Sequence, residues 1–196
     1  MSTETTKTSE SVSSAVIRKS DFVHNASAGG VFTVTCRDKD GNLKWEEAHP
    51  NLVVNQGLQD MNAKYFVGTT YTAAWYLGLV TGPSSGTTFS AGDTLASHGA
   101  TGSGGWTEDT NYSGNRKACT FGTATTADPS VITNSLNTAS FTMTGTTTIA
   151  GAFLCSVASG TSGVLFSVSD FQSPGDRAVV SGDVLVVTYT FNLDAA

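Results

Sequence analysis

The chain has 196 residues and a net charge of −6, and charged residues make up only 13% of it. An acidic chain without clustered Lys and Arg is poorly suited to phosphate backbones, so we expect no nucleic acid partner. The sequence has neither a run of about 18 apolar residues nor the apolar core of a signal peptide, so we expect no membrane partner and synthesis in a reducing cytosol.

The N-terminal residues 1–20 are rich in Ser, Thr, Glu and Lys and carry few apolar side chains. A segment of this composition cannot bury enough apolar surface to fold alone. We therefore predict a flexible N-terminal arm over residues 1–20, followed by one β-rich domain over residues 21–196. Val16 and Ile17 are the side chains of the arm that we expect to contact a partner.

A β-hairpin is predicted after the arm. Phe32, Val34 and Cys36 alternate with polar residues, and a period of two indicates a strand with one buried face. Residues 38–42 (DKDGN) supply the turn, and the return strand starts at Leu43.

The period changes in residues 51–66, where apolar residues recur three and four positions apart. They form the stripe of an amphipathic helix: Val54, Leu58, Met61 and Tyr65. Asn51, which follows Pro50, is the predicted N-cap. Gly57 weakens the pattern without breaking it. This is the only helix that we predict.

Alternating apolar residues return near Trp75 and continue to the C-terminus. The longest run is the last, with one apolar face made of Leu185, Val187, Tyr189, Phe191 and Leu193. A terminal strand of this length is tied into a sheet or lies along a partner. Several short strands separated by Gly- and Ser-rich turns predict a mainly β fold, an antiparallel β-sandwich or jelly roll.

Candidate reaction chemistry is sparse. Gly82–Gly86 matches GxSxG, but no helix pattern follows it, so we interpret it as a turn and not as a nucleophile elbow around Ser84. Asp38, Asp40 and Asn42 have the first spacings of a calcium loop, yet the required glycine is misplaced, which favours a hairpin turn. We assign no catalytic residue, no metal site and no cofactor, and we do not expect an enzyme.

The histidines and cysteines show no motif either. His24, His49 and His98 are scattered, without metal-ligand spacing. Cys36, Cys119 and Cys155 include no CxxC pair, so they predict neither a disulfide framework nor a zinc site. Cys36 and Cys155 lie on inward faces of predicted strands, where they are expected to pack as small apolar residues.

Aromatic residues offer binding as an alternative to catalysis. Trp75, Tyr76, Trp106 and Tyr112 are candidates for a sugar-binding platform or a protein interface, although Trp75 is better explained as core. Trp106 lies in a long Gly-rich segment between about 82 and 120, and segments of that length usually carry function. With the charged Arg116, the candidate interface is Val16, Ile17, Trp106, Tyr112 and Arg116.

Several phrases carry a family resemblance over residues 30–193. They are FTVTCRDKDGNLKWEE (32–47), NLVVNQGL (51–58), TAAWYLGL (72–79), GDTLASH (92–98), GWTE (105–108) and SGDVL (181–185). In this order they resemble small structural proteins of tailed bacteriophages, of the head decoration or cement type. The stretch between residues 99 and 104 is longer than this resemblance leads us to expect.

The resemblance implies a virion protein made in the host cytoplasm and located on the outer capsid surface. Its implied partners are the major capsid protein and further copies of itself as a homo-oligomer, bridging neighbouring capsid subunits. The N-terminal arm would order on the capsid, and the C-terminal strand would pair at a subunit edge. The alternative is a tail-fibre or baseplate module that binds host glycan through Trp106 and Tyr112. No catalytic residue is carried over.

Overall fold

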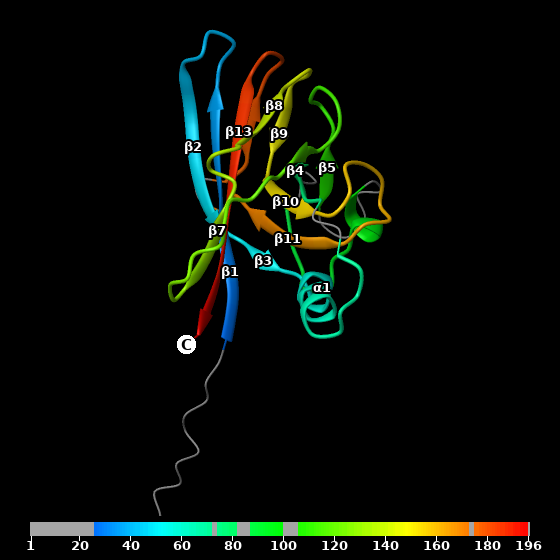
Figure 1. The fold of residues 1–196 in the computed structure, drawn as a ribbon. Helices are drawn as coiled ribbons and strands as arrows, with labels where there is room; N and C mark the ends of the chain where they lie inside the picture. The colour runs from blue at the N-terminus through cyan, green and yellow to red at the C-terminus, as the bar shows by residue number, and fades with distance from the viewer. Residues whose placement is uncertain (1–25, 72–73, 82–86, 100–105, 173–174, 196) are drawn as a thin grey trace, which may run out of the picture.

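The computed structural model describes residues 26–71, 74–81, 87–99, 106–172 and 175–195. Two antiparallel sheets stacked face to face form a β-sandwich, which confirms the predicted mainly β class (Figure 1). The predicted arm over residues 1–20 lies outside the described residues, as do Val16, Ile17 and the GxSxG segment.

The first sheet is built on the two longest strands, β1 (Ala26–Arg37) and β13 (Val184–Ala195), which pair antiparallel from Ala26↔Ala195 to Arg37↔Val184. The strand β2 (Leu43–Pro50) continues the sheet beyond β1. On the other side β13 pairs with β7 (Ser130–Thr133) and with β8 (Ala139–Thr142), one after the other along its length. Figure 1 shows these long strands running side by side.

The second sheet has the order β3-β11-β10-β4-β5, and β6 also pairs with β4. Its strands are short: β3 (Leu52–Val53), β4 (Tyr76–Thr81), β5 (Thr107–Asp109), β6 (Lys117–Ala118), β10 (Gly151–Cys155) and β11 (Leu165–Asp170). A separate two-stranded sheet joins β9 (Thr147–Ile149) to β12 (Arg177–Val179).

The N-terminal hairpin forms as predicted. Asp38 fixes its turn, because its Oδ1 accepts hydrogen bonds from the backbone N–H groups of Asp40 and Asn42, both at 2.9 Å. Gly41 has a φ of 88°, a conformation that glycine adopts without strain. The carboxylate that suggested a calcium loop is thus engaged by the turn itself.

The main core fills the space between the two sheets. From the first sheet the inward residues are Phe32, Val34, Cys36, Leu185, Val187, Tyr189 and Phe191, all buried as predicted. Leu193 is the exception on the predicted face, since it is 42% exposed. A second apolar cluster covers the other face of the second sheet and includes Trp106 and Leu95, the latter from the short π-helix η1 (Leu95–Gly99). Consequently β10 is buried on both faces.

The helix is shorter than predicted and sits differently. Helix α1 spans Asn55–Tyr65, and Val54 and not Asn51 occupies the N-cap, without a side-chain capping bond. The carbonyl of Ala91 instead accepts a hydrogen bond from the N–H of Asn55 at 2.8 Å. The predicted N-cap at Asn51 is wrong, because the Asn51 side chain instead donates a hydrogen bond to the Tyr189 hydroxyl at 2.7 Å.

Gly57 anchors the helix against the sandwich. A Cβ at Gly57 would lie 2.4 Å from the carbonyl oxygen of Phe166, so only glycine permits this close approach to β11. The predicted stripe is therefore only partly buried: Val54 and Met61 pack inward, whereas Leu58 and Tyr65 are exposed. The close contact at Gly57 sets the inward face, and it turns Leu58 and Tyr65 outward.

The C-terminal strand is not available for pairing with another chain. It is central in its sheet, with β1 on one side and β7 and β8 on the other. Between β7 and β8 the buried side chain of Asn134 takes up a backbone hydrogen bond of β13. Its Oδ1 accepts a hydrogen bond from the N–H of Tyr189 at 2.7 Å. The expectation that this strand pairs at a capsid subunit edge is wrong, since its backbone is already paired within the chain.

Candidate functional site

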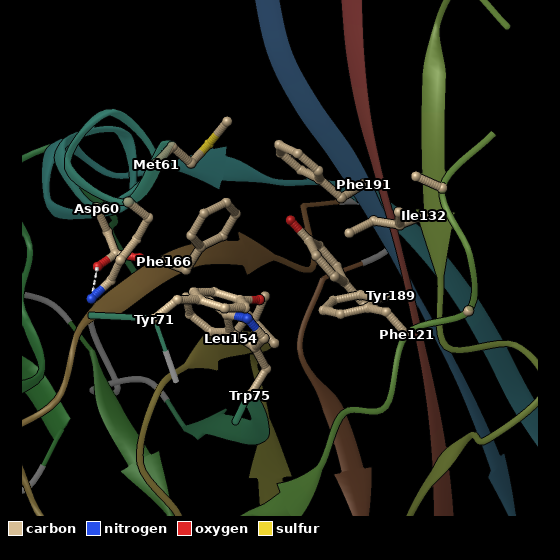
Figure 2. A pocket seen from close by; sticks show the side chains of 13 residues that line it. Asp60, Met61, Tyr71, Trp75, Phe121, Ile132, Leu154, Phe166, Tyr189 and Phe191 are labelled. Carbon is tan, nitrogen blue, oxygen red and sulfur yellow. Dashed lines mark ion pairs between the residues drawn. The ribbon is translucent and has the colours of Figure 1, made fainter. Parts of the chain in front are cut away.

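One hollow of the described structure lies between helix α1 and the part of the first sheet that holds Ile132, Tyr189 and Phe191. It has a volume of about 380 Å³ and is lined mainly by apolar and aromatic side chains (Figure 2). Its lining residues are Asp60, Met61, Lys64, Tyr71, Trp75, Phe121, Gly122, Ala124, Ile132, Leu154, Phe166, Tyr189 and Phe191. We call this the helix pocket.

Aromatic rings form the walls of the helix pocket. The ring centroid of Phe166 lies 5.3 Å from that of Trp75 and 5.4 Å from that of Phe191, both in edge-on geometry. Figure 2 shows Met61 on the helix side of the space, with Phe191 and Tyr189 on the strand side. Rings held at these distances support one another, so the walls are preformed and the surface that they offer is apolar.

Two polar features define the chemistry of the pocket. The hydroxyl of Tyr189 accepts hydrogen bonds from Asn51 Nδ2 at 2.7 Å and from the Ser167 hydroxyl at 3.2 Å. Burial raises the pKa of Tyr189, so the phenol stays neutral. On the helix side Asp60 and Lys64 form an ion pair with 3.9 Å between Oδ1 and Nζ. The pocket thus combines one acidic and one basic side chain with many aromatic rings. Such a lining suits a ligand that is mostly apolar and carries a charged group next to its apolar part.

A group of exposed apolar side chains borders the helix pocket. We call Tyr65, Phe66, Val67 and Tyr71 the helix-end patch; their exposed fractions are 83%, 77%, 75% and 60%. The segment after α1 is folded back on the helix, because Lys64 Nζ donates to the Thr70 carbonyl and the N–H of Thr69 to that of Ala63. Tyr71 belongs to both the patch and the pocket lining.

The aromatic residues that the sequence suggested for binding lie elsewhere and are buried. Trp106 is fully buried; its indole N–H donates to Asp93 Oδ2 at 3.0 Å and its ring packs against Phe89 and Phe153. Tyr112 is buried edge-on against Phe141 at 4.8 Å. The expectation that Trp106 and Tyr112 form an exposed platform is wrong, because the second apolar cluster and the main core enclose them.

Arg116 is equally internal. Its guanidinium makes two hydrogen bonds to Glu108, Nε to Oε1 at 2.8 Å and Nη2 to Oε2 at 2.6 Å, and it lies 5.2 Å from the centre of the Phe153 ring. Burial is the largest influence and opposes its charge, but the hydrogen bonds to Glu108 and the electrostatic effects of Cys155, Glu108 and Tyr112 together outweigh it and raise the pKa of Arg116. Arg116 therefore contacts its own chain and presents almost no area to a partner.

A further group of charges lies on the edge strand β2. The inward-facing Glu47 pairs with Arg177, and His49 Nε2 lies 3.3 Å from Glu47 Oε2 while its ring stacks on Phe171. Inward-pointing charges on an edge strand discourage pairing with other chains. We interpret this group as protection of the sheet edge. The side chain of His98 and all of His24 lie outside the described residues.

All three cysteines are buried free thiols. Burial raises the pKa of Cys36 to about 11 and that of Cys119 to about 12, and it raises the pKa of Cys155 despite the nearby Arg116. A thiol that stays protonated at neutral pH is a poor nucleophile. The predicted inward positions of Cys36 and Cys155 are confirmed.

Within the described ranges, no three His, Cys, Asp or Glu side chains are grouped in a way that would hold a metal ion. Among the same residues, no helix has both the length and the apolar character needed to cross a membrane. No known protein family, curated protein or solved structure matches the chain.

The helix pocket and the helix-end patch are not predicted by the sequence pattern. Tyr65 belongs to the predicted buried stripe of the helix but is exposed. Trp75 packs against the main core as predicted, and it also lines the pocket. The signal that was present is the run Tyr65-Phe66-Val67 directly before Gly68. Three large apolar residues at the end of a short helix exceed what one inward-facing stripe can bury.

Proposed function

We propose that this chain is a structural protein of a phage virion that decorates the capsid and stabilises it by bridging neighbouring capsid subunits. The observation that carries the proposal is the helix-end patch, where Tyr65, Phe66, Val67 and Tyr71 stand in solvent. Contiguous apolar side chains on an otherwise polar surface mark interaction sites. The resemblance to phage decoration proteins supplies the partner, which is the major capsid protein.

The size of the patch fits a repeated weak contact. An aromatic side chain buries roughly 150–250 Å², so three aromatic residues and a valine offer about 500 Å². A standard interface needs about 800 Å² from each partner. One patch alone is therefore a weak contact, and bridging several subunits, or acting as a homo-oligomer, raises the overall affinity through multivalency. Binding to the mature lattice then stabilises that lattice by mass action.

The alternative function, glycan binding by a tail-fibre or baseplate module, loses its supporting residues. Trp106 and Tyr112 were its candidates, and both side chains are enclosed by their own chain. We therefore favour decoration.

The proposal is tested by cryo-EM of the particle that carries this protein, together with a capsid-binding assay. We expect density at regular lattice positions with α1 facing the capsid, and at least a tenfold loss of affinity for the double variant Tyr65→Ser/Phe66→Ser. Both side chains are exposed, so the fold should keep its stability to within about 0.5 kcal/mol.

Leu136→Ser is the matched control, because Leu136 is 90% exposed and lies between β7 and β8, outside the patch. This variant should bind capsids like the unmodified protein. Density confined to the tail, or capsid binding by the double variant at full strength, contradicts the proposal.

A further inference from the structure

The helix pocket is an apolar space close to the point where the described chain begins. Ala26 is the first described residue and pairs with Ala195 at the end of the first sheet. Phe191, which lines the pocket, lies four residues before Ala195 on the same strand. At about 3.4 Å per residue, the pocket is roughly 14 Å along the strand from the point where residues 1–25 join the sheet.

The length of the preceding chain determines which of its residues can reach the pocket. The direction of β1 means that a segment returning to the pocket must first reverse, which takes a turn of at least two residues. Phe22 and Val23 are too close to Ala26 to do this, since four residues span at most about 14 Å. Ile17 and Val16 are nine and ten residues from Ala26, and nine residues span up to about 32 Å, which leaves enough chain for the turn and the return.

We propose that residues Ala15, Val16 and Ile17 of the same chain occupy the helix pocket in the free protein. They are the three consecutive apolar residues of the segment, and the pocket offers Met61, Phe166 and Phe191 to them. The basic pair Arg18-Lys19 follows directly. Asp60 on the pocket wall complements it, because the 3.9 Å separation from Lys64 leaves its carboxylate without a close hydrogen bond from that lysine.

The same chain, and not a second copy, is the source of the segment. A short tether keeps its own segment at an effective concentration in the millimolar range, which a free second copy does not reach in dilute solution. The inference concerns the isolated protein and holds whether or not the protein binds a capsid. Its failure and the failure of the proposed function are therefore distinguishable.

The three tryptophans provide a direct test. Trp75 lines the pocket, whereas Trp45 packs against Phe171 and Trp106 against Phe153, outside the pocket lining. In protein labelled with ¹⁵N-tryptophan, each indole N–H gives one NMR signal. We expect deletion of residues 1–20 to shift the Trp75 signal and to leave those of Trp45 and Trp106 in place. The double variant Val16→Ser/Ile17→Ser should reproduce the shift.

Phe22→Ser is the matched control, because it removes a larger apolar side chain from the same segment at a position that cannot reach the pocket. The Trp75 signal of the Phe22→Ser variant should match that of the unmodified protein. A Trp75 signal unaffected by the deletion would overturn the inference, as would a shift caused by Phe22→Ser and not by the double variant. A signal that moves toward that of the deletion variant on tenfold dilution would show that a second copy supplies the segment, and would overturn it too.

Discussion

Two regions of this molecule are rich in aromatic side chains, and they differ in how much of each ring is enclosed. Around β5 and β10, Trp106, Tyr112 and Arg116 are buried and held by Asp93 and Glu108. Around α1, Tyr65, Phe66 and Tyr71 are exposed beside an open pocket. The first region encloses its aromatic residues within the fold, and the second leaves them exposed to solvent. Aromatic content therefore does not identify a binding surface, whereas hydrogen-bond partners and enclosure do.

The largest expected effect comes from breaking the enclosed region. Arg116→Met leaves the Glu108 carboxylate in a buried site without its guanidinium, and removing one member of a buried pair costs about 3–5 kcal/mol. This cost is measured as the decrease in the free energy of unfolding, obtained by urea denaturation. Lys39→Ala is the control, because Lys39 pairs with Asp40 in solvent and should change stability by less than about 1 kcal/mol. If Arg116→Met lowers the free energy of unfolding as little as Lys39→Ala does, the enclosed region does not depend on its buried ion pair for stability, and the contrast between the two regions fails.

A smaller effect is expected at the anchor of the open region. Gly57→Ala places a methyl group 2.4 Å from the Phe166 carbonyl oxygen, so α1 must shift away from β11 at a cost of about 1–3 kcal/mol. The shift should also alter the helix pocket, which hydrogen exchange of the α1 amides would report. Gly92→Ala is the matched control, since the nearest atom to its Cβ, Ser90 Oγ, is 3.8 Å away. Unchanged stability and exchange for Gly57→Ala would contradict the tight contact.

The smallest expected effect is a change in the free energy of unfolding with pH, which should differ between a cysteine near the helix pocket and one in the enclosed region. Cys119, near the helix pocket, has a pKa raised by burial alone from 9.0 to about 12. The unfolded chain releases this proton near pH 9 and the folded chain near pH 12. The stabilisation from the neutral thiol is therefore complete below pH 9 and is lost as the pH rises toward 12. Between pH 8 and pH 10 the loss is about 1 kcal/mol.

Cys119→Ala should flatten this decline in the free energy of unfolding. Cys155 is the comparison, because Arg116 lowers its pKa and so offsets part of the increase caused by burial. Cys155→Ala should flatten the decline less. Equal slopes for the unmodified protein and Cys119→Ala would show that the thiol does not ionise differently in the two states.

Local pattern predicted the class and several elements. Alternation placed Phe32, Val34 and Cys36 on one face of β1, and Asp38 with Gly41 indicated the turn. These features follow from residues a few positions apart, whose geometry depends little on the rest of the chain. The helix was located, but its inward face was misassigned, because a contact with Phe166, more than a hundred residues away, decides which side packs.

The candidate site was not predictable in the same way. Trp106 and Tyr112 lie near Gly-rich sequence, which favoured exposure, yet η1, β8 and β10 enclose them. Trp75 packs against the main core as predicted, but the sequence does not indicate that it also lines a pocket. Enclosure depends on which distant elements pack over a residue, and the periodicity of one segment carries no information about that.

By itself the sequence determined the mainly β class, the N-terminal hairpin and the buried face of the C-terminal strand. Each of these is a consequence of short-range geometry, since side chains alternate along a strand and turns need particular backbone angles. Only the tertiary structure decided that β13 is paired on both sides, that Arg116 is internal, and that Tyr65 and Phe66 stay in solvent. These outcomes depend on long-range packing, in which each contact is settled by segments far apart in the chain.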